Sequence, residues 1–185
     1  MDFVTDFPRS QKGHDDIFVI IDCFSKVAHF LPVKEMITAS QLADLYVSRI
    51  VSLHGIPLEI SSDRGSLFTS RFWESFQEAM GTHLSFSTAY HPQSQGQVER
   101  VNQVLEDMLR ACVISFGKKW EESLPFVEFS YNNSYQASCR WPPLKFFMYV
   151  SVEPLSIGQK LGNEHSLVRI LSEMLKNKLT LSVNI

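Results

Sequence analysis

Ile17-Phe18-Val19-Ile20-Ile21-Asp22 places five consecutive apolar residues directly before an acid. A short continuous apolar run of this kind is typical of a strand that is buried on both faces of a sheet. A second such run, Ala28–Val33, follows a brief polar segment, and Pro32 indicates its end or a sheet edge. Met1–Thr5 is also β-like. Residues 1–33 therefore predict three short strands that meander.

Helices and strands alternate after this region. Thr38 and Gln41 have the spacing of a capping box and predict a helix that ends before Gly55. Thr69 or Ser70 is the predicted cap of the next helix. The predicted elements are a helix over 39–53, a strand over 58–62, a helix over 71–80 and a strand over 84–86. Three meandering strands followed by this alternation indicate an α/β fold with a mixed sheet covered by helices.

Three further helices are predicted towards the C-terminus. Ser94 and Gln97 form another capping-box pattern, which predicts a long helix with an apolar stripe from Val98 to Phe116, closed by Gly117. A helix over about 123–133 would carry Pro125 in its first turn, where proline is tolerated. Residues 164–179 have the pattern of a final amphipathic helix.

Composition and charge restrict the class of protein. The chain has 185 residues, of which 44% are hydrophobic, and its 17 basic and 20 acidic residues give a net charge of −3. This composition excludes wholesale disorder and a basic protein that coats DNA through a large Lys/Arg excess. The N-terminus lacks the pattern of a secretory signal, and the three cysteines form no CxxC motif, so we expect an intracellular, reducing compartment. In that compartment we expect Cys23 and Cys112 to be small buried apolar residues.

Three carboxylates occupy positions from which they could hold a divalent metal ion. Asp2 lies in the first predicted strand, Asp63 directly follows the strand over 58–62, and Glu99 lies in the first turns of the long helix. Mg²⁺ takes oxygen ligands and needs only a few carboxylates. Each acid also has a structural interpretation: a solvated terminal residue for Asp2, a turn or cap residue for Asp63, and an acid that complements the helix dipole for Glu99.

Two motifs decide between these interpretations. They are Ser62-Asp63-Arg64-Gly65 with Phe68-Thr69-Ser70, and His91-Pro92-Gln93-Ser94-Gln95-Gly96-Gln97-Val98-Glu99-Arg100-Val101-Asn102. Residues 1–138 resemble the catalytic core of retroviral-type integrases, above all that of gypsy-type LTR retrotransposons. The 35 residues numbered 64–98 separate Asp63 from Glu99, which is the spacing of the family's Asp-Asp-Glu triad. Further stretches that match are Met1-Asp2-Phe3-Val4, Asp22 with Ser25-Lys26, Ala28-His29-Phe30, Leu53-His54-Gly55-Ile56-Pro57 and Tyr131-Asn132.

The resemblance implies a fold, a metal site and a reaction. The fold would be RNase H-like, a five-stranded mixed sheet flanked by α-helices. Asp2, Asp63 and Glu99 match the three catalytic carboxylates and would bind Mg²⁺ or Mn²⁺. The implied reaction is two-metal phosphoryl transfer, which trims the 3′ ends of the element's DNA and joins them to target DNA.

The resemblance also implies partners. The loop over 91–97 and the helix that it opens would approach DNA, with Gln93, Gln95, Gln97 and Arg100 as candidate DNA-binding residues, although capping and solvation would explain these residues equally well. Family members act as multimers on nuclear DNA, so a homo-oligomer in the nucleus is expected by analogy, with no membrane association.

Departures from the family pattern give two alternatives. The sequence starts in the strand of the first aspartate, and the match decays after Ser138, so that residues 139–185 form a diverged segment with a predicted terminal helix. A second hypothesis is therefore a truncated or decayed, catalytically inactive remnant that keeps the fold and binds nucleic acid weakly at most. A third, an RNase H-like nuclease acting on RNA, leaves the motif over 91–102 unexplained.

Overall fold

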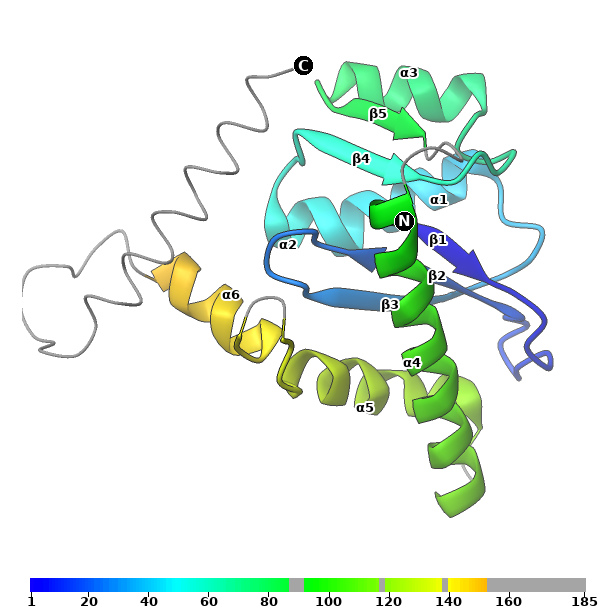
Figure 1. Ribbon diagram of the computed structural model, residues 1–185. Helices are drawn as coiled ribbons and strands as arrows, with labels where there is room; N and C mark the ends of the chain where they lie inside the picture. Colours follow the sequence, from blue (N-terminus) through cyan, green and yellow to red (C-terminus); the bar gives the residue numbers. More distant parts are fainter. Residues whose placement is uncertain (87–91, 117–118, 138–139, 153–185) are drawn as a thin grey trace, which may run out of the picture. The chain divides into compact units, whose positions relative to one another are not determined.

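The computed structural model describes residues 1–86, 92–116, 119–137 and 140–152, with side chains for all of these except 92–95, 115–116 and 148–152 (Figure 1). Gly117 and the helix predicted over 164–179 lie outside the described residues. The first compact unit of the chain is Met1–Phe147. It contains all five strands and the site predicted from the carboxylates.

The strands form two hydrogen-bonded ladders. β1 (Asp2–Val4), β2 (Asp16–Ile21) and β3 (Ala28–Val33) make an antiparallel sheet in that order, and β4 (Glu59–Ser62) pairs in parallel with β5 (His83–Phe86). Asp2 lies opposite Val19, and Ile20 opposite His29. All the strands predicted from the sequence are therefore present, and both kinds of pairing occur.

The prediction of one continuous five-stranded sheet is only partly met. Within the described residues the five strands divide into a three-stranded and a two-stranded ladder. The two meet where the amine of Met1 donates a hydrogen bond to the Ser61 carbonyl at 2.7 Å. β1 is three residues long, so it offers β4 little backbone with which to extend this contact into a ladder. The α/β class is confirmed, with β1 and β4 as neighbours.

Helices follow the order expected from the sequence. They are α1 (Ala39–Tyr46), the π-helix η1 (Val47–Val51), α2 (Ser52–His54), α3 (Arg71–Ala79), α4 (Pro92–Phe116), α5 (Trp120–Asn133) and α6 (Pro143–Val152). The capping box of Thr38 and Gln41 is confirmed, and Ser70 is the residue that caps α3. Gly55 ends α2 with φ 78°, a conformation that glycine adopts without strain.

Two helix starts differ from the prediction. α4 begins at Pro92, so Ser94 lies inside the helix and is not its cap; proline is favoured at a first helical position because its missing N–H would have no partner there. α5 begins at Trp120, three residues earlier than predicted, which places Pro125 in the second turn. Burial of the Trp120 side chain and two acids in the first turn favour this earlier start. α6 was not predicted.

β2 separates two apolar clusters, as its continuous apolar run predicts. Ile17 and Val19 face a cluster that contains Val101, Leu105 and Leu109 of α4 together with residues of α5. Phe18 and Ile20 face the other cluster, with Leu42 of α1 and Trp73 of α3. Each fully buried side chain of this size contributes about 1.5–3 kcal/mol relative to exposure. Helices therefore cover both faces of the first sheet (Figure 1).

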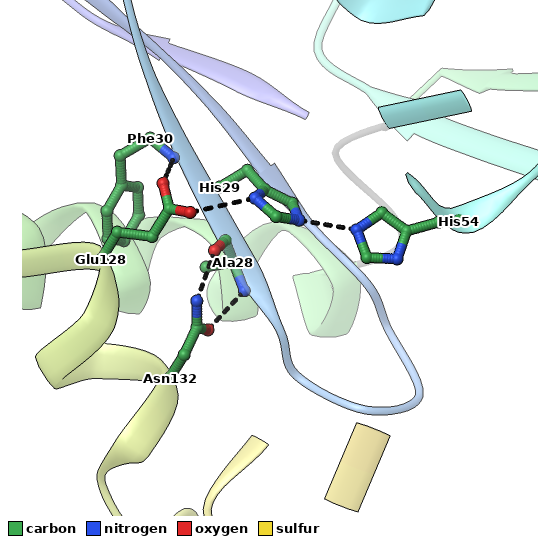
Figure 2. A network of polar contacts seen from close by, with 6 residues as sticks. All are labelled: Ala28, His29, Phe30, His54, Glu128 and Asn132. Carbon is green, nitrogen blue, oxygen red and sulfur yellow. Dashed lines mark hydrogen bonds and ion pairs between the residues drawn. The ribbon is translucent and has the colours of Figure 1, made fainter. Parts of the chain in front are cut away.

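Side chains of α5 occupy the hydrogen-bonding groups at the outer edge of β3 (Figure 2). Asn132 accepts from the Ala28 N–H and donates to the Ala28 carbonyl, both at 2.8 Å. Glu128 accepts from the Phe30 N–H at 2.9 Å. An edge strand with unpaired backbone groups invites pairing with another chain. Asn132 and Glu128 take the place of a further strand and fix α5 along the sheet.

We expect Asn132→Ala to lower the free energy of unfolding by about 1–3 kcal/mol, because it leaves both buried backbone groups of Ala28 without partners. Urea unfolding followed by circular dichroism measures the change. Asn133→Ala is the matched control, since Asn133 is the next residue of α5 and is exposed. Equal midpoints for the two variants would contradict the role given to Asn132.

Candidate functional site

The candidate site lies where β1 and β4 are neighbours. Asp2 is the first residue of β1, and Asp63 directly follows the last residue of β4. Burial raises the pKa of Asp2, hydrogen bonds from the Phe3 N–H and the Asn102 amide oppose this rise, and the negative charge of Asp63 adds to it. The structure thus brings two carboxylates, 61 positions apart in the sequence, within electrostatic reach of each other.

The turn after β4 holds Asp63 at this position. The Gly65 N–H donates to Asp63 Oδ1 at 3.2 Å, so the side chain of Asp63 caps its own turn, as its structural interpretation predicts. A Cβ atom on Gly65 would lie 3.2 Å from the same oxygen, which is tighter than ordinary van der Waals contact. Glycine therefore allows the close approach. The turn role and the proposed metal role use the same carboxylate and are compatible.

A hydrogen bond fastens the long helix to β1 at the same place. Asn102 Nδ2 donates to Asp2 Oδ2 at 2.8 Å. Glu99 lies three residues before Asn102 on α4, and residues three apart share one face of a helix. The side chain of Glu99 therefore leaves α4 near the face that approaches Asp2. Its side chain is exposed, and across the described residues no three His, Cys, Asp or Glu side chains are close enough to hold a metal ion together.

The oxygen atoms around the carboxylate pair suit a hard divalent cation. One buried oxygen, Asn102 Oδ1 on the side chain that donates to Asp2, has no hydrogen-bond partner in the structure. A buried polar atom without a partner costs free energy, which a ligand or a bound water would recover. Mg²⁺ binds through one or two carboxylates and keeps several waters. Asp2, Asp63 and the Asn102 oxygen are ligands of the type that such an ion takes.

The residues predicted to bind DNA differ in exposure, and the structure describes the side chains of only two of them. Gln97 is partly buried, and its Oε1 accepts a hydrogen bond from Lys26 Nζ at 3.0 Å. Arg100 is exposed on α4. Gln93 and Gln95 belong to the first turn of α4, and their side chains lie outside those that the structure describes.

Sequence reasoning missed two residues near the site, Asn102 and Lys26. Asn102 stands one helical turn after Glu99, so the helix period could have placed it beside the carboxylates. Lys26 belongs to the turn between β2 and β3, which the sequence does not connect with α4. Cys23 in this turn is exposed, so the prediction that it is buried is wrong. The reason is that it follows β2 and lies in a turn at the surface.

His29 of β3 and His54 of α2 form a second polar cluster together with Glu128 of α5 (Figure 2). His29 Nδ1 lies 3.1 Å from Glu128 Oε1, and His29 Nε2 lies 2.8 Å from His54 Nε2. With Glu128 ionised, His29 Nδ1 donates to it, and a neutral His54 then donates to His29 Nε2. Burial lowers the pKa of His54, a protonated His29 would lower it further, and Asp22 raises it.

The chain is similar to known proteins both in sequence and in fold. Residues 1–92 match the family described as Integrase core domain. The Transposon Tf2-3 polyprotein of Schizosaccharomyces pombe is 36% identical to the chain over 145 residues, which are 78% of this chain and 11% of that polyprotein. The chain therefore spans about a tenth of the length of the curated relatives it matches.

Solved structures establish the fold. The simian T-cell lymphotropic virus intasome in complex with PP2A regulatory subunit B56 gamma matches with a TM-score of 0.68 and 16% identity, over 86% of this chain and 58% of that one. The HTLV-2 integrase catalytic core domain in complex with magnesium matches with a TM-score of 0.62 and 18% identity, over 78% of this chain and 93% of that one. The fold is thus that of retroviral integrase catalytic cores. No helix among the described residues is long and apolar enough to cross a membrane.

We expect Asp63→Asn to move the pKa of Asp2 down towards its ordinary value, because the substitution removes a neighbouring negative charge while keeping an oxygen for the Gly65 N–H. Carboxyl-selective NMR titration measures this pKa. Asp44→Asn is the control, since it removes an exposed acid from α1. An Asp2 titration that is the same in both variants would show that the two carboxylates are not coupled.

The lowered pKa of His54 predicts a loss of stability in acid. The unfolded chain takes up the His54 proton near the ordinary value of about 6.5, before the folded chain does, so the free energy of unfolding falls as the pH decreases from about 6.5 through the lowered folded pKa. His54→Gln removes this part of the pH dependence. Urea unfolding at pH 8 and pH 5 measures it, and an equal decrease in both proteins would contradict the assignment.

Proposed function

We propose that this chain, whose residues 1–92 match the Integrase core domain, is the catalytic core of a gypsy-type retrotransposon integrase, with residues 1–138 as the catalytic module. Its reaction would be metal-dependent trimming of the element's DNA ends and their transfer into target DNA. The observation that carries the proposal is that Asp2 and Asp63 lie where β1 and β4 are neighbours, beside an α4 that Asn102 fastens to β1. The 36% identity to a retrotransposon polyprotein supports the choice of element.

Asp2, Asp63 and Glu99 are the residues that would hold Mg²⁺ or Mn²⁺. The bound ions would activate water or a 3′-hydroxyl as the nucleophile and stabilise the leaving oxygen. Asp2 binds a metal ion as the carboxylate, and its raised pKa moves the pH range over which this ligand forms upwards. The Asn102 amide orients one oxygen of Asp2, and the exposed Glu99 side chain is free to change rotamer towards the pair.

DNA is the proposed partner, bound beside the start of α4. Gln97 and Arg100 lie in the early turns of this helix, with Gln93 and Gln95 in its first turn, and a helix N-terminus favours phosphate. Because the chain has a net charge of −3, its attraction to DNA must come from individual positive or polar groups near the site and not from its overall charge. The HTLV-2 core occurs in trimeric and dimeric forms, and we extend self-association to this chain. Action on chromosomal DNA would take place in the nucleus.

The exposure of Glu99 favours a second candidate, an inactive retrotransposon-derived remnant with the same fold. In the described part of the chain Glu99 does not complete a three-ligand group with the two aspartates. If Glu99 cannot reach the pair even with metal present, the chain would bind nucleic acid weakly and would not turn over.

Incubation with a labelled DNA end and Mg²⁺ or Mn²⁺ tests the proposal by end trimming, strand transfer and its reversal. We expect Asp63→Asn and Glu99→Gln each to lower activity by about 100-fold or more, because each removes charge that neutralises the transition state through the metal. Glu106→Gln is the control, since Glu106 is exposed further along α4. Activity that survives both substitutions would overturn the assignment, and an inactive but folded parent would establish the remnant.

A further inference from the structure

Lys26 has a backbone conformation that its side chain does not favour. It lies in the turn between β2 and β3 with φ 65°, in the left-handed region where a residue other than glycine costs roughly 1–2 kcal/mol. Strain of this kind persists only where the surroundings enforce it. A glycine would adopt the same turn freely, so the backbone conformation gives no reason for lysine at this position.

The turn is held firmly around Lys26. Asp22 Oδ2 accepts from the Ser25 N–H at 2.8 Å and from Ser25 Oγ at 2.6 Å. The Lys26 N–H donates to the Asp22 carbonyl at 2.9 Å, and the Asp22 N–H donates to the Val27 carbonyl at 2.9 Å. These bonds over-determine the backbone and fix the direction in which the Lys26 side chain leaves it.

That direction leads to the start of α4. Lys26 Nζ donates to Gln97 Oε1 at 3.0 Å and to the Cys23 carbonyl. Gln97 stands two residues before Glu99 and five before Asn102, which is about 7.5 Å along the helix axis at 1.5 Å per residue. The ammonium therefore lies at the level of α4 that carries Glu99 and that Asn102 fastens to Asp2, on the side of the helix where Gln97 stands, and Gln97 and Glu99 do not share a face.

The same turn borders the carboxylate pair from the other side. Asp2 lies opposite Val19, two residues before β2 ends at Ile21, so the turn that follows β2 lies at the same end of the sheet as the start of β1. Asp2, Asp63 and Glu99 make this corner negative, and a phosphodiester that approached it would be repelled. A cation fixed at the rim offsets that repulsion. An ammonium has three donors, and the two bonds above use two of them.

We propose that Lys26 is a phosphate-binding residue of this site, which contacts a backbone phosphate of the DNA next to the carboxylates; the proposal rests on the function proposed above. The strained turn places the ammonium, and Gln97 holds it in position until DNA arrives. The alternative is that Lys26 is only a structural link between the turn and α4. The two roles predict opposite results for substitutions at this one position.

DNA affinity measured by fluorescence anisotropy over a range of salt concentrations separates them. We expect Lys26→Gln, which keeps a long side chain that can donate to Gln97, to weaken binding and to reduce the slope of log K against log salt by about 0.9 on duplex DNA, the loss of one phosphate contact. Lys26→Arg should keep the slope. Lys34→Gln is the matched control, because it removes an exposed positive charge beyond the opposite end of the β2–β3 pair.

Lys26→Gly tests the structural role directly, because it relieves the positive φ and removes both contacts of the side chain. We expect its urea midpoint to equal or exceed that of the parent, while its salt slope falls as in Lys26→Gln. An unchanged slope in Lys26→Gln, in a parent that binds DNA and is active, would overturn this proposal alone. A parent that binds no DNA would overturn it together with the proposed function.

Discussion

A carboxylate that is partly buried at the end of a sheet needs a hydrogen-bond donor, and the Asn102 side chain supplies one to Asp2. This contact joins α4 to β1, two elements far apart in the chain. Because it lies one helical turn from Glu99, it also determines which face of α4 approaches the two aspartates. The arrangement of the candidate site follows from this bond together with the neighbouring ends of β1 and β4.

The rest of the first compact unit keeps these elements in place. β2 is buried on both faces, so helices must cover both sides of the first sheet. α5 satisfies the outer edge of β3 through Asn132 and Glu128, and α4 packs against α5 in the apolar cluster that both helices share with the sheet. The site therefore lies on a sheet whose two faces are covered by helices and whose outer edge at β3 is hydrogen-bonded to α5. Its own acids lie at one end of β1.

Features of the fold could be predicted from the sequence where a few neighbouring residues determine them. The capping box at Thr38 and the two-sided burial of β2 are properties of a few neighbouring residues, and both predictions are confirmed. The starts of α4 and α5 were misplaced because proline and tertiary burial of Trp120 outweighed the capping pattern. The division of the strands into two ladders depends on backbone contacts between distant segments, which no local pattern contains.

The amino-acid sequence by itself determined, through periodicity, the α/β class and the chain order of the elements up to α5. Through its resemblance to the integrase family it also singled out the three candidate carboxylates with their spacing. Only the tertiary structure decided that Asp2 and Asp63 are electrostatically coupled, that Asn102 orients Asp2, that Glu99 is exposed, and that Lys26 reaches Gln97. The physical reason is that side-chain distances and burial arise from packing between segments remote in the chain, whereas sequence patterns report mainly the preferences of neighbouring residues.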